Sequence, residues 1–149
     1  MLGTSKMRPD IDIYLNVDGV LLDENSRPAN YSREFIKYIV SNFNTYWLSS
    51  RSKDGNFVII KELSKIFEPK IVELIGQVRP TRWSFAKTQA IDFSRPFLWF
   101  DDELVIHERL ELISNNALES WIEVNLAKDE NRLADFLVRF PQPANYVFF

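Results

Sequence analysis

The sequence predicts a three-layer α/β domain in which helices cover both faces of a mostly parallel sheet of about five strands. Short apolar segments suited to buried strands alternate with segments whose apolar residues recur at helical spacing. Polar residues directly follow several strand segments, where parallel sheets place their ligand sites. The 149 residues suit one domain, expected over 11–140 between a leader, 1–10, and a tail, 141–149.

The first half of the chain supplies two predicted strands and two predicted helices. The run 11–17 (IDIYLNV) is rich in residues that favour a buried strand. Ser32 suits a helix N-cap, and apolar residues follow it at helical spacing. A short strand is expected at 45–48, and a helix at 56–67 that Pro69 ends.

The second half continues the alternation. The segment 71–78 fits either a strand or a helix, and we interpret it as a strand because it is short and Pro80 follows it. The remaining elements expected are a short helix at 83–91, a strand at 97–100, a helix at 103–115, a last strand at 121–124 and a last helix at 129–140.

Composition narrows the classes of function. A net charge of -3 argues against a general nucleic-acid binder, because neutralising phosphates requires clustered Lys and Arg. The absence of cysteine excludes disulfides, thiolate catalysis and cysteine zinc sites. The longest apolar runs fall far short of the ~20 residues that span a bilayer, and residues 1–10 lack a signal peptide's apolar stretch. We therefore expect a soluble, cytoplasmic protein without a membrane partner.

Asn16 and Asp18 follow the first predicted strand. They are two residues apart, so their side chains point the same way on an extended chain, and Gly19 permits a sharp exit. Two carboxylates at this spacing can serve as nucleophile and general acid/base. The alternative is an ordinary turn, because Asn-x-Asp-Gly also suits turn geometry.

Three further segments carry polar groups toward the same expected edge. Ser49 ends the second strand, where a hydroxyl can donate to a phosphate oxygen. Lys87 offers an ammonium that can neutralise phosphoryl charge. Asp101 and Asp102 end the strand at 97–100 and suit a Mg²⁺ held partly by water. Each residue alone has a simpler interpretation, as a loop, a solvated lysine or a helix start, but their coincidence favours a functional site.

This order of motifs resembles the haloacid-dehalogenase-like (HAD-like) phosphohydrolase superfamily. That family carries an apolar strand ending in Asp-x-Asp-Gly-(Thr/Val)-Leu, a strand ending in Ser or Thr, a Lys, and a strand ending in Asp-Asp. The matching elements here extend from 11 to 102. The resemblance implies a Rossmann-like, five-stranded sheet. The loops 18–31 and 50–70 are too short for an inserted domain, so it also implies the capless type.

The resemblance implies a role for each matching position. Asp18 would be the general acid/base, and its backbone carbonyl would ligate Mg²⁺. Ser49, with Ser50 as an alternative, and Lys87 would bind the phosphate group. The implied ligands of Mg²⁺ are Asn16, Asp18, Asp101 and Asp102. Four basic residues near the expected opening are either solvated or attract an anionic ligand: Arg51, Lys53, Arg79 and Arg82.

Asn16 departs from the family pattern, which has an aspartate nucleophile at this position. A neutral amide is a poor nucleophile for phosphorus, although its oxygen can still coordinate a metal. The expected function is a Mg²⁺-dependent phosphate-ester site of the phosphohydrolase (phosphatase) type with impaired or no turnover. Its ligand would be a small phosphorylated molecule or the end phosphate of a nucleic acid.

Several alternatives stay open at this point. The chain is a natural non-catalytic relative, an engineered trap variant, or an enzyme in which Asp18 activates water directly. A pseudoenzyme reading makes it a binding or regulatory module on a HAD-like scaffold. A flavodoxin-like fold with an acidic receiver-type site is a further alternative, but it leaves the Asn16-x-Asp18-Gly19 spacing unexplained. The oligomeric state is not predicted.

Overall fold

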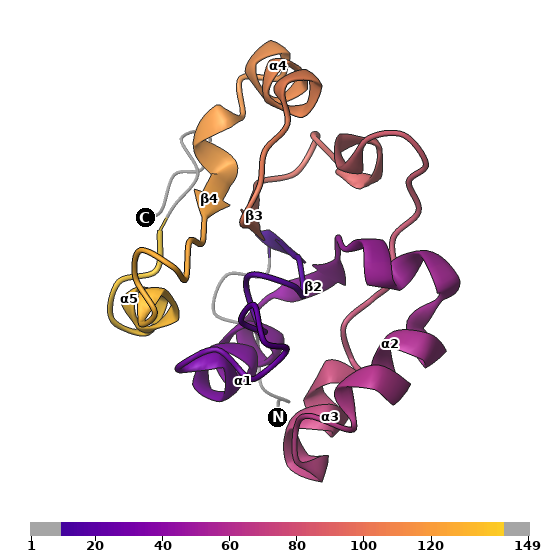
Figure 1. Ribbon diagram of the computed structural model, residues 1–149. Coiled ribbons are helices and arrows are strands. Elements are labelled where there is room, and N and C mark those ends of the chain that lie inside the picture. The colour runs from indigo at the N-terminus through magenta and orange to yellow at the C-terminus, as the bar shows by residue number, and fades with distance from the viewer. Residues whose placement is uncertain (1–9, 142–149) are drawn as a thin grey trace, which may run out of the picture.

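The computed structural model describes residues 10–141, so most of the predicted leader and tail lie outside the described residues. All strands of its single sheet are parallel, in the order β2-β1-β3-β4 (Figure 1). This part of the chain therefore contains four strands where about five were expected. The strands are β1 (Asp12–Leu15), β2 (Asn44–Trp47), β3 (Phe97–Asp101) and β4 (Trp121–Glu123).

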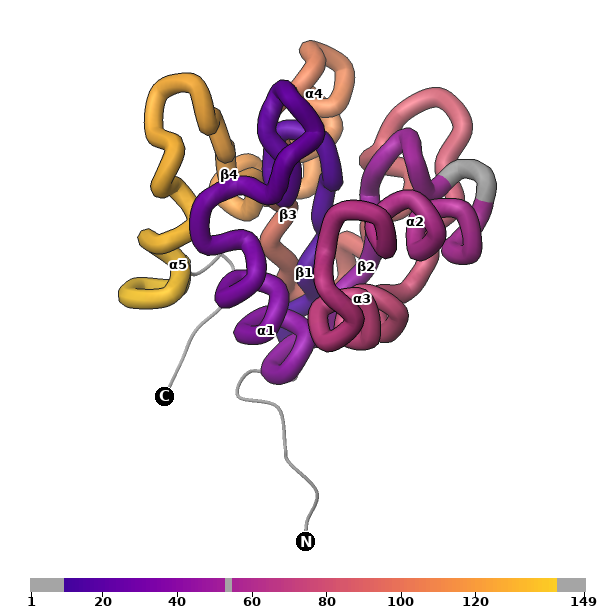
Figure 2. Tube along the Cα trace, turned by 60° about the horizontal axis from the view of Figure 1, so that its bottom comes forward, coloured from indigo at the N-terminus to yellow at the C-terminus, as the bar shows by residue number. Residues whose placement is uncertain are grey.

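Helices cover both faces of the sheet, which confirms the layered α/β architecture (Figures 1 and 2). One face packs against α1 (Ser32–Asn42), α2 (Asn56–Leu63), α3 (Pro69–Ile75) and α5 (Asp135–Val138). The other face packs against α4 (Ile106–Ser114) and the connection that precedes β3. Short 3₁₀ turns complete the chain: η1 (Ser50–Asp54), η2 (Lys87–Ala90), η3 (Leu118–Ser120) and η4 (Arg132–Ala134).

The strand side chains alternate between two separate cores. Ile13 and Leu15 of β1 join the larger core beneath α1 and α3, whereas Tyr14 joins the smaller one beneath α4. In β3, Phe100 faces the larger core and Trp99 the smaller one. Both faces of each central strand are therefore buried, which explains why these strands read as continuous apolar runs.

The interpretation of 71–78 as a strand is wrong, because this segment begins within α3. Pro69 occupies the first turn, where its missing N–H costs nothing, and Ile71 and Ile75 bury one side of the helix. Only Arg79, beyond this segment, pairs with the sheet, through an isolated bridge to Tyr46.

Four predicted helices are shorter than expected. The helix expected at 56–67 ends at Leu63, and Pro69 begins α3 instead of ending that helix. The segment 83–91 contains only η2, and 129–140 contains only η4 and α5. The helix expected at 103–115 begins at Ile106. Within residues 10–141, no helix has the length and apolar character required to cross a membrane.

Tyr14 offers a pH test of the smaller core. Burial raises its pKa to about 12, while its hydroxyl accepts a hydrogen bond of 3.1 Å from the backbone N–H of Asp92. The buried phenol therefore stabilises the fold fully below about pH 10, and this contribution is lost as the pH rises through 12. We expect ultraviolet titration to show one tyrosine ionising near pH 12. Tyr14→Phe should remove that component, the exposed-site control Tyr31→Phe should keep it, and complete ionisation by about pH 11 would refute the assignment.

Candidate functional site

Parallel pairing brings the predicted site residues to one edge of the sheet. Leu15 lies opposite Phe100, and the N–H of Asn16 donates to the carbonyl of Phe100 at 3.0 Å. Asn16 therefore lies next to Asp101 at the carboxyl ends of β1 and β3. On the other side of β1, the N–H of Leu48 donates to the carbonyl of Leu15 at 2.7 Å. This bond extends the pairing to the residue before Ser49.

Asn16 lies at the centre of the polar cluster. Its side-chain nitrogen, Nδ2, lies 2.6 Å from the carbonyl oxygen of Asp18, 3.1 Å from Oδ1 of Asp101 and 3.2 Å from Oδ1 of Asp102. The residue is only 7% exposed. The buried amide of Asn16 thus contacts both the turn after β1, at Asp18, and the acidic pair Asp101 and Asp102 at the end of β3.

The backbone carbonyl and the side-chain carboxylate of Asp18 have different partners, Asn16 and Arg51. The chain turns sharply after it, where Gly19 adopts a φ of 82°. The carboxylate receives two hydrogen bonds of 2.9 Å from the guanidinium of Arg51, which also donates to Glu62 at 3.0 Å. The bond from Arg51 holds the pKa of Asp18 below its usual range. Asp18 is therefore ionised and paired at neutral pH.

Asp101 is the most deeply buried acid of the cluster, at 1% exposure. Its Oδ2 accepts from the ammonium of Lys87 at 2.7 Å and from the indole of Trp99 at 3.1 Å, and its Oδ1 accepts from the backbone N–H of Asp102 at 2.8 Å. Burial raises the pKa of Asp101 to about 6, and the Lys87 ammonium opposes this shift without cancelling it.

Lys87 is held in place by two side chains that the sequence did not reveal. The side-chain oxygen of Gln89 accepts from the backbone N–H groups of residues 84–86, at 2.9 to 3.2 Å, and so fixes the turn before η2. Buried Glu108 of α4 accepts from the backbone N–H of Lys87 at 2.9 Å. The Gln89 contact is a local capping-box interaction that was missed from the sequence, whereas the Glu108 contact joins residues twenty-one apart and has no local motif.

Ser49 is fully buried one strand away from Asn16. Its hydroxyl oxygen accepts from the backbone N–H of Arg51 at 3.2 Å, and it caps η1. Its alternative, Ser50, is exposed. The structure therefore gathers Asn16, Asp18, Lys87, Asp101 and Asp102 directly, and connects Ser49 to them through Arg51. From the sequence, Arg51 was expected only to lie near the opening of the site, and no partner was predicted for it.

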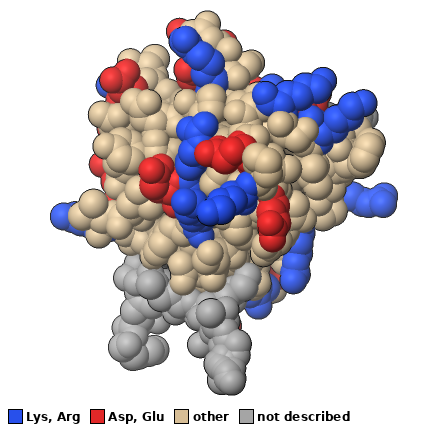
Figure 3. Space-filling view, turned by 90° about the horizontal axis from the view of Figure 1, so that it is seen from below, with Lys and Arg blue, Asp and Glu red and all other residues tan. Residues whose placement is uncertain are grey.

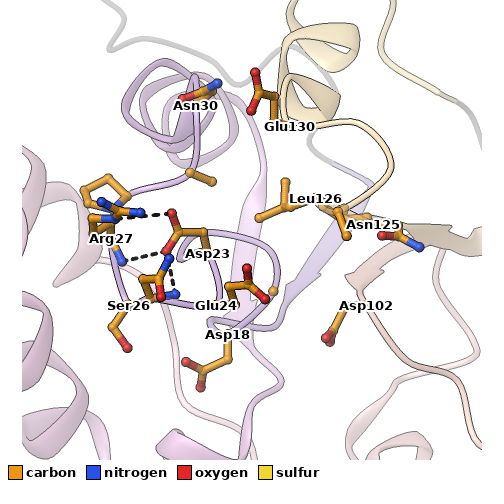
Figure 4. A pocket seen from close by; sticks show the side chains of 16 residues that line it. Asp18, Asp23, Glu24, Ser26, Arg27, Asn30, Asp102, Asn125, Leu126 and Glu130 are labelled. Atoms are coloured by element: carbon orange, nitrogen blue, oxygen red, sulfur yellow. Dashed lines mark hydrogen bonds and ion pairs between the residues drawn. The ribbon is translucent and has the colours of Figure 1, made fainter.

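A hollow of about 610 Å³ opens beside this cluster, between the loop 18–30 and the segment that follows β4 (Figure 4). Asp18 and Asp102 line it where it adjoins the cluster, and Asn125, Leu126 and Glu130 line it from the segment after β4. The residues that line the hollow include one basic residue, Arg27, and a larger number of acidic residues. The acidic residues are Asp18, Asp23, Glu24, Asp102 and Glu130. An anion that enters this hollow therefore meets negative charge unless a cation accompanies it.

Charge on the outer surface is mixed. On the face shown in Figure 3, basic and acidic side chains lie next to one another near the centre. Exposed ion pairs among residues 10–141 include Arg33 with Glu68 at 2.8 Å.

The oxygen donors at the sheet edge are of the kind that Mg²⁺ prefers. They are the carboxylates of Asp101 and Asp102, the carbonyl of Asp18 and the amide oxygen of Asn16. No group of three or more His, Cys, Asp or Glu side chains within residues 10–141 is placed to hold a metal ion. A Mg²⁺ at this edge would have two carboxylates and the Asp18 carbonyl as protein donors, with the Asn16 amide oxygen added only if the amide turned, because its nitrogen faces these atoms.

Together, these features define a small α/β domain with a four-stranded, all-parallel sheet and a buried polar cluster at its carboxyl edge. No protein-family model, curated protein or solved structure matches the chain.

Arg51 provides a direct test of the electrostatics at Asp18. Arg51→Met should raise the pKa of Asp18 toward that of an ordinary carboxyl, because the guanidinium is the main cause of its lowering. Carboxyl carbon shifts measured by NMR against pH would report the change. Glu62→Gln is the matched control, since it removes the other partner of Arg51 and leaves both bonds to Asp18. An unchanged Asp18 pKa in Arg51→Met would contradict the assignment.

Proposed function

We propose that this chain is a HAD-like domain with a Mg²⁺-dependent phosphate-ester site of the phosphohydrolase type, which binds its ligand with little or no turnover. The observation that carries the proposal is the convergence at one sheet edge of the Asn16, Asp101 and Asp102 side chains, the Asp18 carbonyl and the Lys87 ammonium. These are the positions that the resemblance selected from sequence. Their meeting across more than eighty residues of chain supports the same assignment.

In this proposal the phosphate group is bound by Lys87 and Ser49. The side chain of Lys87 is 17% exposed, and its ammonium could turn from Asp101 toward an anion. The hydroxyl of Ser49 has a hydrogen to donate, since in the described contacts its oxygen acts as an acceptor. Asp101, Asp102 and the carbonyl of Asp18 would hold Mg²⁺, which when bound offsets the negative charge of the phosphate and of the acidic hollow.

Two features support binding rather than turnover. Residue 16 is an amide, which does not form an aspartyl-phosphate. Asp18 has a lowered pKa and both of its carboxylate oxygens are bonded to Arg51, so in this ligand-free state it is ionised at neutral pH and holds no proton to donate until Arg51 moves away. The ligand we propose is a small phosphorylated molecule or the end phosphate of a nucleic acid, since the hollow beside Asp18 is open and of moderate size.

A second candidate is a binding or regulatory module that has kept the scaffold without the phosphate site. The observation that favours it is the internal pairing of the acids: Asp18 with Arg51, and Asp101 with Lys87. A cluster satisfied in this way does not need a ligand for stability. This candidate predicts that phosphate esters, with or without Mg²⁺, do not change the melting temperature.

Calorimetric titration with a panel of phosphomonoesters, in the presence of millimolar Mg²⁺, separates the two candidates. A ligand that binds only the folded state should also raise the melting temperature. Ser49→Ala and Lys87→Met should each weaken binding at least about tenfold, as expected for loss of one good hydrogen bond to a charged group. Lys61→Met, on the exposed side of α2, is the matched control for Lys87. Absence of binding by every compound would refute the phosphate-ester site.

A further inference from the structure

The amide nitrogen of Asn16 occupies an unusual position among oxygen atoms. Three acceptors surround Nδ2: the carbonyl of Asp18 at 2.6 Å and one carboxylate oxygen each from Asp101 and Asp102, at 3.1 and 3.2 Å. These are the same atoms that the proposed function assigns to Mg²⁺. The amide offers two N–H groups to the three oxygens.

Electrostatics determines which end of the amide faces inward in the absence of a cation. With the amide oxygen inward, four oxygen acceptors would meet at a site where Asn16 is 7% exposed, and only Oδ1 of Asp101 would keep a donor, the backbone N–H of Asp102 at 2.8 Å. With the nitrogen inward, all three neighbours accept hydrogen bonds. The other oxygen of Asp101 is bonded to Lys87 and Trp99, so the cluster is satisfied by protein donors alone.

We propose that the Asn16 amide nitrogen is a built-in substitute for the divalent cation, so that metal and amide compete for the same three oxygens. Metal entry requires the amide to turn, which breaks the contacts to Asp18, Asp101 and Asp102 at once. This inference rests on the proposed function for the identity of the competing ligand. It concerns the metal alone and involves no phosphate.

Replacing Asn16 by alanine separates a competitor from a ligand. If the side chain acted mainly as a metal ligand through its oxygen, Asn16→Ala would weaken metal binding. If the nitrogen competes, Asn16→Ala removes the competitor and should bind Mn²⁺, used as a spectroscopic probe for Mg²⁺, at least about fivefold more tightly than the wild type; fivefold corresponds to roughly 1 kcal/mol, the net worth of one hydrogen bond. Free Mn²⁺ is measured by electron paramagnetic resonance in the absence of phosphate.

Asn16→Asp gives a second, independent measurement. A third carboxylate then lies against Asp101 and Asp102 without a donor, so we expect the melting temperature in chelator to fall by at least about 5 °C. Millimolar Mg²⁺ should restore most of the lost melting temperature of Asn16→Asp, whereas the melting temperature of the wild type should change by no more than about 1 °C. Asn116→Asp is the matched control: it makes the same chemical change at an exposed position after α4.

The outcomes are distinct. Tighter Mn²⁺ binding by Asn16→Ala, together with Mg²⁺-dependent stability of Asn16→Asp alone, supports the proposal. Equal or weaker Mn²⁺ binding by Asn16→Ala overturns it, as does a stability of Asn16→Asp that Mg²⁺ does not change. A protein that shows the expected metal behaviour but binds no phosphomonoester would keep this inference and refute the phosphate-ester function.

Discussion

Changing Asn16 to aspartate is expected to give the protein measurable phosphomonoesterase activity in the presence of Mg²⁺. The substitution places a carboxylate where the HAD-like pattern has its nucleophile, beside the carbonyl of Asp18 and opposite Asp101. Nucleophile losses in enzymes cost several orders of magnitude in rate, so the gain over the wild type should be at least about a thousandfold. Release of inorganic phosphate from a broad panel of monoesters is the measurement.

Two further variants test whether the activity arises from this site. Asn16→Ala should remain inactive, because it supplies no nucleophile. Adding Asp18→Asn to Asn16→Asp should remove most of the gain, since the residue proposed to transfer the proton is then an amide. If Asn16→Asp turns over none of the panel while it remains folded and binds Mg²⁺, the phosphohydrolase assignment of this cluster is wrong.

The central strands could be predicted from the sequence because their burial on both faces requires consecutive apolar residues. β1 and β3 are buried on both faces, so residues 13–15 and 97–100 appear as apolar runs followed by polar residues. The segment 71–78 misled because Ile71 and Ile75 are spaced for a helix, while its short length and Pro80 suggested a strand. Which of two periods is realised in so short a segment depends on tertiary contacts, here the packing of α3 beneath α1.

The candidate site was predictable only where it lies directly at strand ends. Asn16, Asp18, Asp101 and Asp102 follow strands that pair in parallel, so topology alone brings them together. Arg51 reaches Asp18 through the conformation of η1, and Glu108 reaches Lys87 from a helix twenty-one residues later. Neither contact has a sequence spacing that identifies it. Consequently the acids of the cluster were foreseen, but the partners that determine their charge were not.

Gly19→Ala is expected to destabilise the protein more than any comparable change at an exposed turn. Gly19 has a φ of 82°, which side chains rarely adopt, and an added Cβ would lie 2.5 Å from Cγ and 2.8 Å from Cβ of Asp102. Because Cβ of Asp102 is tied to its backbone, rotation of the carboxylate cannot relieve the second contact. Backbone strain and overpacking should together cost about 2 to 5 kcal/mol in the free energy of unfolding.

Gly55→Ala separates these two contributions. Gly55 also has a positive φ, 97°, but an added Cβ there meets nothing within 4 Å, so its cost of about 1 to 3 kcal/mol reports backbone strain alone. Urea denaturation of both variants should show Gly19→Ala as the less stable by at least about 1 kcal/mol. Because Asp102 must also move away from Nδ2 of Asn16, Gly19→Ala alone should perturb the amide resonances of Asn16. Equal losses in the two variants, with Asn16 unperturbed, would mean that Asp102 does not pack against this turn and that the cluster is more open than described above.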